Sequence, residues 1–394
     1  MYDVHAVRKD FPVLSKVVYL DSTATTQTPV PAVEAMNEYF YEYAGNHGRG
    51  AHRLARETTT RYEDARERVA AFLKADPSKT VFTKNTTEGI NLVANSFPFK
   101  AGDHIVTTLI EHHSNLLPWL RLQKMGVEVT IVKPEGPEGL IDPESIEKAL
   151  TDRTKLVAVT QVSNVFGSVQ AVARITKMIH RNGVKVLIDG AQSAGHMPVE
   201  LSALDCDFFA TAGHKGLLGP QGTGVLYIKE PDLLESAFVG GGTVSGVEGL
   251  NYVLEPSPAC FEAGTPNIPG VIGLGRAVEY LEDIGVFEIE KHETRLARET
   301  AARLSEMEHV EVYGPTERAG VVPFNVRGLH AHDVALILDQ SRKICVRSGH
   351  HCAIPSINFL EVDSTVRASF ALYNTEEEVD ALIGAVSDLK ALVA

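Results

Sequence analysis

Lys215 and Asp189 are the residues whose types and placement most directly indicate chemistry. Lys215 follows Gly213 and His214 at the end of an apolar run, and Asp189 ends another apolar run 26 residues upstream. A lysine amine condenses with an aldehyde, and a carboxylate keeps a pyridine nitrogen protonated, which makes the ring an electron sink. An amine and a carboxylate at the mouths of two buried strands therefore predict a site for pyridoxal phosphate (PLP).

Polar residues near other predicted strand ends suit the same cofactor. Gln192 could donate a hydrogen bond to the phenolic oxygen of the ring. Thr86 and Thr87 begin an amphipathic segment, and the free N–H groups of a helix N-terminus bind phosphate. Taken alone, threonines at such a position are more often simple helix caps, and Asp189 could merely cap a turn.

Two histidines, His112 and His113, follow a further predicted strand. One of the two imidazoles could stack on the cofactor ring and move protons. A metal site is the competing interpretation, because His350, His351 and Cys352 form a second group of potential ligands. Adjacent histidines rarely face one metal, and no acidic or Cys-x-x-Cys ligands are spaced to complete four-coordination, so we expect no metal.

The elements that must position these residues alternate between about residues 80 and 230. Amphipathic segments of helical length separate short runs that are apolar at nearly every position, which span 104–110, 155–162, 184–190 and 207–213. Strands buried on both faces of a parallel sheet have this composition, and ligands gather at the carboxyl ends of such strands. The pattern predicts an α/β fold with helices on both sides of the sheet.

The composition changes after residue 230. Residues 231–249 are typical of a loop, and two helical patterns over 271–283 and 287–307 then precede three short apolar segments. A last helix is predicted after Asn374, because Thr375 and Glu378 have the spacing of a capping box. We expect a large domain over 15–270 and a smaller α+β domain over 1–14 and 271–394.

The overall charge is acidic. Asp and Glu number 51 against 37 Lys and Arg, which gives a formal net charge of −14. This balance disfavours nucleic acid or an anionic membrane as a partner. Residues 1–14 lack a signal-peptide pattern, and no apolar run approaches the ~20 residues that span a bilayer. We therefore expect a cytoplasmic protein.

A family resemblance rests on many segments in order along nearly all 394 residues. Besides the Gly-His-Lys turn, they include YLDSTATTQTP, NHGRGAH, TTEGINLVANS, EHHSNLLPW, FEAGTPN, VRSGHHCAIP and VRASFALYNTEEEVD. With these segments the chain resembles the group II (Suf-type) cysteine desulfurases, which belong to the class V PLP-dependent aminotransferases. The resemblance implies a fold-type-I homodimer with active sites at the dimer interface, and a mostly parallel seven-stranded sheet in the large domain.

The resemblance also implies a role for individual residues of the cofactor site. Lys215 would be the Schiff-base lysine, with Asp189 on the ring nitrogen, Gln192 on the phenolic oxygen and His112 as the stacked acid/base. The phosphate would be held by Thr86, Thr87 and His214, and Thr265 would reach the phosphate of the neighbouring subunit.

Further residues would hold the substrate. Asn164 would lie near both cofactor and substrate, and Arg367 would bind the substrate carboxylate with a bidentate guanidinium. Arg347 and Arg49 are weaker candidates for the same pocket. Two positions depart from the family pattern: Ala212 replaces a serine that helps to bind phosphate, and Gly48 replaces a histidine. Thr211, Thr243 or water would have to compensate for Ala212.

Cys352 decides which reaction we expect. A lone cysteine is usually a small buried residue, as Cys206 and Cys345 are expected to be, and Cys260 is ambiguous. Cys352 instead lies in a loop between glycine and proline, beside Arg347 and two histidines that favour a thiolate. The resemblance implies that its thiolate takes sulfur from L-cysteine, forms a persulfide and releases L-alanine.

Only fifteen positions separate Cys352 from Arg367, so we expect the nucleophile on a compact, restrained loop. A Suf-type acceptor protein, or a small thiol or reductant, would then have to approach the persulfide. Iron–sulfur cluster assembly is the destination implied by the resemblance. The alternatives are a selenocysteine lyase, a class V aminotransferase and a non-catalytic scaffold that kept the fold.

Overall fold

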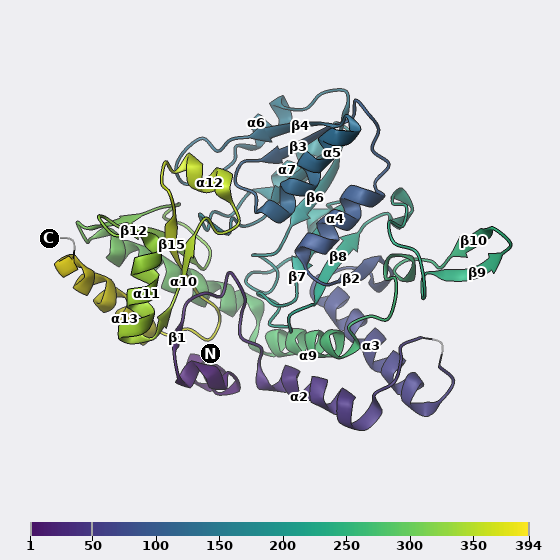
Figure 1. The fold of residues 1–394 in the computed structure, drawn as a ribbon, viewed down its shortest axis with the longest axis horizontal. Coiled ribbons are helices and arrows are strands. Elements are labelled where there is room, and N and C mark those ends of the chain that lie inside the picture. Colours follow the sequence, from purple (N-terminus) through teal and green to yellow (C-terminus); the bar gives the residue numbers. More distant parts are fainter. Residues whose placement is uncertain (1, 49, 393–394) are drawn as a thin grey trace.

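A seven-stranded sheet forms the centre of the larger part of the molecule in the computed structural model, which describes residues 2–48 and 50–392 (Figure 1). The sheet order is β2 (Thr80–Thr83), β8 (Gly224–Ile228), β7 (Phe208–Ala212), β6 (Lys185–Asp189), β5 (Thr154–Thr160), β3 (His104–Thr108) and β4 (Glu128–Val132). The strands from β7 to β4 are parallel, and β8 runs antiparallel to both of its neighbours. The predicted α/β class, the mostly parallel sheet and the four predicted strands are thus confirmed.

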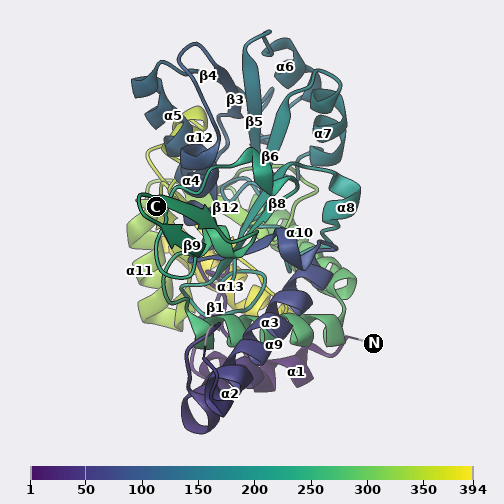
Figure 2. The same cartoon turned by 90° about the vertical axis from the view of Figure 1, so that its right-hand side faces the viewer.

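Successive residues of each strand pack on opposite faces of this sheet. In β6, Val186 and Ile188 join one apolar cluster and Leu187 joins another. One face is covered by α4 (Thr86–Ser96) and α5 (Leu117–Leu122), and the other by α6 (Pro143–Lys148), α7 (Val172–His180) and α8 (Leu201–Leu204) (Figure 2). Strands that are buried on both faces must be apolar at almost every position, which is why the sequence shows them as continuous apolar runs.

Three helices extend the larger part away from the sheet. They are α2 (Val30–Glu38), α3 (Arg53–Phe72) and α9 (Ile268–Ile284), and α9 packs against both α2 and α3 at the bottom of Figure 1.

The smaller part is an antiparallel sheet with helices packed on it. Its order is β11 (Val310–Val312), β12 (Val321–Val326), β15 (Thr365–Ser369) and β14 (Arg347–Gly349). The helices are α10 (Val286–Ser305), α11 (Ala331–Arg342) and α13 (Glu376–Asp388). The capping box predicted for the last helix is confirmed, since Thr375 and Glu378 exchange hydrogen bonds.

The N-terminal residues run beside the smaller part. After α1 (Val4–Val7), β1 (Val18–Tyr19) pairs in parallel with β13 (Ile344–Cys345). The domain boundaries given above stay a prediction. Over the described residues, no helix has the length and apolar composition needed to cross a bilayer.

The prediction of a loop over 231–249 is wrong in part, because the structure forms the first strand and the turn of a β-hairpin there. The hairpin consists of β9 (Val244–Glu248) and β10 (Asn251–Leu254), and it projects from the body of the molecule (Figure 1). Gly249 takes φ +61° at the turn. Neither strand has a buried face, so the alternation of apolar and polar residues that reveals a half-buried strand is missing.

Candidate active site

Most of the predicted site residues line one cavity of about 270 Å³ at the carboxyl ends of β5, β6 and β7. These residues are Thr86, Thr87, His112, Asn164, Asp189, Gln192, His214, Lys215, Arg347, Cys352 and Arg367. The larger part of the chain supplies one wall, and β14, β15 and the loop after β14 supply the other. Ligands of open α/β sheets bind at this place, outside the carboxyl ends of the strands.

Lys215 and Asp189 lie at the carboxyl ends of two neighbouring parallel strands, β7 and β6. Asp189 is the last residue of β6 and is 3% exposed, and Lys215 follows β7 by three residues. Burial lowers the pKa of Lys215 to about 8, although the Asp189 carboxylate opposes the shift. Burial also raises the pKa of Asp189. Two groups oppose this shift: the N–H of Ala191, which donates to Asp189 Oδ1 at 2.9 Å, and the charge of Lys215. The two groups therefore supply a nucleophilic amine and a buried carboxylate at one site.

A tight turn places Lys215 there. Gly213 precedes it and packs so closely on Thr223 that an added Cβ would lie 2.1 Å from the Thr223 Oγ1. Only glycine permits this approach, which explains the glycine of the Gly-His-Lys turn.

The N-terminus of α4 forms another end of the cavity. Asn85 caps the helix by accepting the N–H of Glu88 at 2.9 Å, so the first turn is fixed without use of the two threonines. Thr87 Oγ1 lies 2.6 Å from Ser114 Oγ, and Thr86 Oγ1 is buried without a partner among the described residues. Free backbone N–H groups and a spare hydroxyl make this end a suitable place for an anion.

His112 is held in one tautomer by its neighbour Ser114. Its Nδ1 accepts the backbone N–H of Ser114 at 3.1 Å, so the neutral ring carries its proton on Nε2. Burial lowers the pKa of His112 to about 3, and the charge of Lys215 adds to the shift. The ring is consequently neutral near pH 7, as a ring stacked on a cofactor should be.

Gln192 and His214 complete the predicted cofactor side. Gln192 Nε2 donates to the carbonyl of Thr23 at 3.0 Å, which leaves its second N–H for a ligand. His214 Nδ1 lies 3.2 Å from Thr25 Oγ1, and burial lowers the pKa of His214 to about 4.

Arg367 is a buried guanidinium with a free donor. Its Nη1 donates to the carbonyl of Asn164 at 3.0 Å, its Nη2 lies 3.4 Å from Asp21 Oδ1, and its Nε has no partner among the described residues. Burial lowers the pKa of Arg367 to about 10. The register of β14 and β15 sets Arg347 directly opposite Arg367, so both cations line the cavity. A ligand carboxylate is the natural partner for this pair.

The loop between β14 and α12 (Ile354–Phe359) presents Cys352 to the cavity. The loop is short and anchored: the carbonyl of Cys352 accepts the N–H of His113 at 2.7 Å, and that of His351 accepts Asn164 Nδ2 at 2.8 Å. His351 and Cys352 both have left-handed backbones, with φ +53° and +55°. Such values are uncommon for residues other than glycine and often occur at functional sites.

The four cysteines differ in exposure. Cys352 is exposed, Cys206 and Cys260 are buried, and Cys345 is half-buried. Burial raises the pKa of the Cys206, Cys260 and Cys345 thiols. Cys352 is the one that also lines the cavity.

Several polar residues in or beside the site were not predicted from the sequence. Ser114 links Thr87 to His112, and Asp21 pairs with Arg367. Glu111 is fully buried, its pKa is raised to about 8 by burial, and it accepts the N–H of Thr160 at 3.0 Å. Ser114 and Glu111 adjoin the histidine pair and could have been suspected. Asp21 gives no such signal, because it reaches the site only through tertiary packing.

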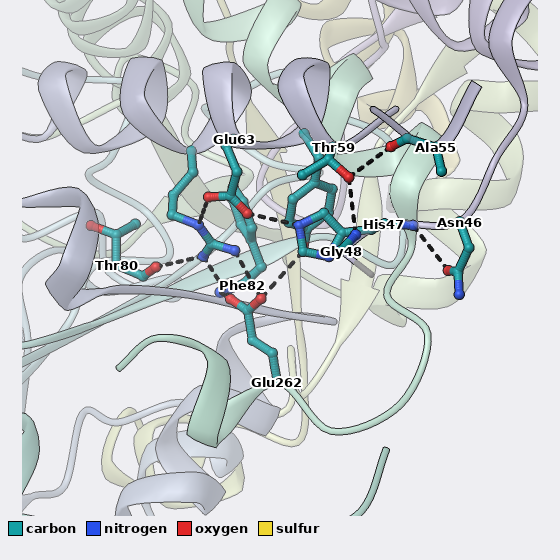
Figure 3. A network of polar contacts seen from close by, with 11 residues as sticks. Asn46, His47, Gly48, Ala55, Thr59, Glu63, Thr80, Phe82 and Glu262 are labelled. Atoms are coloured by element: carbon teal, nitrogen blue, oxygen red, sulfur yellow. Dashed lines mark hydrogen bonds and ion pairs between the residues drawn. The ribbon is translucent and has the colours of Figure 1, made fainter. Parts of the chain in front are cut away.

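Thr265 lies outside this cavity. It lines a separate cavity of about 760 Å³, together with Phe82 and Lys84. A network ties its segment to α3: Arg66 donates to both oxygens of Glu262 at 2.7 and 2.9 Å, and the N–H of Phe82 donates to Glu262 at 2.6 Å (Figure 3). One chain therefore does not bring Thr265 to Lys215.

The two departures from the family pattern have clear local settings. Gly48 has φ +94°, a backbone that favours glycine, and its N–H donates to Thr59 Oγ1 at 3.0 Å (Figure 3). Ala212 lines the cavity and offers no hydroxyl, while Thr211 Oγ1 is occupied by the carbonyl of Gly190 at 3.1 Å. Arg49 lies outside the described residues.

Comparison with known proteins defines the class to which this fold and site belong. Residues 18–382 match the family model of the class-V aminotransferases, and the chain belongs to this family. It is 49% identical over 382 residues to a probable cysteine desulfurase of Methanothermobacter thermautotrophicus, with 95% of each sequence covered.

Solved structures agree with this assignment. A cysteine desulfurase from Thermococcus onnurineus NA1 is 47% identical with a TM-score of 0.94, over 99% of this chain and 98% of that chain. A cysteine desulfurase of Escherichia coli is 36% identical with a TM-score of 0.93, over 100% of both chains. The narrower assignment to the group II branch stays a prediction.

Proposed function

We propose that this chain is a PLP-dependent cysteine desulfurase that converts L-cysteine to L-alanine and leaves a persulfide on Cys352. The observation that carries the proposal is one cavity that combines an exposed cysteine with Lys215, Asp189 and Arg367. An aminotransferase needs the lysine and the aspartate but has no use for a cysteine at this place. The names of the relatives support the same activity.

The residues present fit PLP. Thr86 has an unpartnered buried hydroxyl at a helix N-terminus, where the phosphate would be held with Thr87 and His214. Asp189 would face the ring nitrogen, and Lys215 would hold the aldehyde carbon. When bound, PLP supplies an electron sink for the substrate α carbon.

The chain's own groups perform the remaining tasks. Arg367, which lines the cavity, binds the substrate carboxylate with its guanidinium. Lys215, with its pKa lowered to about 8, removes the proton of the substrate α carbon as a neutral amine and returns a proton to the substrate as an ammonium group. The N–H of Ser114 donates to His112 Nδ1, and this hydrogen bond keeps the proton of the neutral His112 ring on Nε2.

Cys352 performs the sulfur transfer. Its thiolate attacks the Sγ of the substrate, a new S–S bond forms, and the Cβ–Sγ bond breaks. The electron pair of the broken bond stays on the substrate carbon and is protonated, which gives alanine. The anchored loop holds Cys352 in place, so a sulfur acceptor must come to the persulfide, and a Suf-type protein that serves iron–sulfur cluster assembly is the acceptor we propose.

A homodimer completes the proposal. Thr265 lines a cavity apart from Lys215, and a second copy could bring this threonine to the phosphate end of its neighbour. The β9–β10 hairpin exposes Leu250, Val247 and Tyr252, which a second chain would cover. We place the enzyme in the cytoplasm by inference from its sequence.

Alanine release from L-cysteine and L-selenocysteine tests the function. Wild-type protein should release alanine from L-cysteine, and Cys352→Ala should lose this activity. If Cys352→Ala retained full desulfuration, or if the protein preferred L-selenocysteine and needed no thiol, a selenocysteine lyase would be the better description. Amino transfer from alanine to an added keto acid at comparable rates would instead identify an aminotransferase.

A further inference from the structure

A second cavity of about 360 Å³ lies between the two parts of the chain, behind the catalytic cavity. Gln192 and Thr23 line both cavities and are joined by the hydrogen bond from Gln192 Nε2 to the carbonyl of Thr23. The second cavity has an apolar wall that includes Leu140, Val169 and Met197. The proposed desulfurase reaction gives no task to its other lining residues.

Arg318 lines this cavity as a buried cation without a counter-charge. It is 5% exposed, and within residues 2–48 and 50–392 no carboxylate forms an ion pair with it. Its Nη1 and Nη2 donate to the carbonyls of Tyr313 and Gly314 at 3.0 and 3.3 Å, and its Nε has no partner among the same residues. A buried guanidinium is costly unless an anion compensates it.

Glu293 of α10 lines the same cavity and is acidic, whereas Arg318 is a cation. It is 2% exposed, and its Oε2 lies 2.9 Å from His196 Nδ1. Its Oε1 is buried and has no partner in the described part of the chain. Glu290 and Glu317 add further acidic groups to the lining, which disfavours a ligand with more than one negative charge.

The cavity is preformed rather than a gap between mobile parts. The N–H of Ala319, next to Arg318, donates to the carbonyl of Gly167 at 2.9 Å. The carbonyl of Gly320 accepts the N–H of Phe370 at 2.8 Å. The segment that carries Arg318 is thus hydrogen-bonded both to Gly167 of the larger part and to Phe370, the residue after β15, and ligand sites are often found at such domain interfaces.

We propose that this cavity is a second ligand site, which binds a small α-amino acid with an apolar side chain in its zwitterionic form. The ligand carboxylate pairs with the guanidinium of Arg318, its ammonium group pairs with the carboxylate of Glu293, and its side chain packs on the apolar wall. This inference goes beyond the proposed reaction and does not depend on it. Because Gln192 lines both cavities, a ligand bound in the second cavity would also lie beside a residue of the catalytic cavity.

Calorimetric titration of the PLP-loaded protein with three probes tests the proposal. The probes are L-leucine, isocaproate, which lacks the ammonium group, and isoamylamine, which lacks the carboxylate. We expect saturable binding of L-leucine and binding of each analogue weaker by about tenfold or more, the usual effect of losing a charged hydrogen bond. The cofactor absorbance, recorded alongside, reports any amine that enters the catalytic cavity instead.

Variants assign the binding to this cavity. Arg318→Gln should weaken L-leucine binding by about tenfold or more. Leu140→Trp should do the same by filling the entrance, and it changes a side chain that is 45% exposed, so folding is preserved even if Arg318→Gln is unstable. Arg303→Gln, on the same helix as Glu293 but outside the cavity, is the matched control and should bind normally. The proposal is overturned by absence of saturable binding, by unchanged binding in Leu140→Trp, or by an analogue that binds as well as L-leucine.

Discussion

Arg367 shows how burial prepares a single residue for one task. The fold uses two of its donor groups for Asn164 and Asp21, and its buried Nε has no partner among the described residues. We therefore predict that Arg367→Lys raises the KM for L-cysteine by about 10- to 100-fold, because lysine cannot form the side-on pair with a carboxylate. Steady-state alanine formation measures this effect. Arg342→Lys is the control, because Arg342 lies outside the cavity and pairs with Asp388, and it should leave the KM unchanged; an equal effect of both variants would contradict the assigned role.

The lowered pKa of Lys215 has a measurable consequence for cofactor loading. Only the neutral amine can attack an aldehyde, so the rate at which the apo-protein takes up PLP should rise with pH and level off above about 8. The midpoint of this rise in rate would lie at about pH 10.4 for an unperturbed lysine. Because Asp189 raises the pKa of Lys215, Asp189→Asn should move the midpoint to lower pH. Stopped-flow absorbance follows the uptake, and a wild-type midpoint near that of free lysine would refute the argument.

Much of the site could be predicted from the sequence, because polar residues follow the predicted strands. Lys215 and Asp189 follow apolar runs, so their placement at one sheet edge could be predicted from parallel topology. Asp21 could not be predicted this way, since it meets Arg367 from a distant part of the chain. The tautomer of His112 was also hidden, because it depends on a hydrogen bond from Ser114.

At the scale of elements, the short connection from β14 to α12 controls where the nucleophile lies. The sequence predicted a restrained loop from its length, and the structure adds the anchoring bonds and the left-handed backbone at Cys352. Strands β3, β5, β6 and β7 of the large sheet were predictable because burial on both faces demands apolar runs, whereas β4 is largely exposed and was not predicted. The β9–β10 hairpin was not, because its strands are exposed and show no periodic pattern.

The left-handed backbone predicts an unusual order of stability. Cys352→Gly should be more stable than Cys352→Ala by about 1 kcal/mol, because glycine adopts φ +55° without steric cost. Urea unfolding of the apo-proteins measures the difference. Ile354, in the helix α12 that follows, provides the control, where alanine should be the more stable replacement. A less stable Cys352→Gly would mean that the loop relaxes in solution.

For the whole molecule, the separation of Thr265 from Lys215 makes association part of the proposed function. We predict that the protein has twice the mass of one chain by light scattering. The double variant Val247→Asp and Leu250→Asp should weaken the dimer and lower the affinity for PLP, because a charged hairpin resists burial against a second chain. Leu336→Asp, at another exposed leucine, should leave the mass unchanged. A wild-type monomer with full activity would remove the need for Thr265.

In the proposed reaction, Cys352 receives the sulfur of the substrate. Mass spectrometry of the PLP-loaded protein after brief exposure to L-cysteine, followed by peptide mapping without reduction, tests it most directly. We expect one added sulfur atom on the peptide that contains Cys352 and none in Cys352→Ala. An added sulfur on Cys345 or Cys260 instead, or alanine release with no adduct on any cysteine, would contradict it.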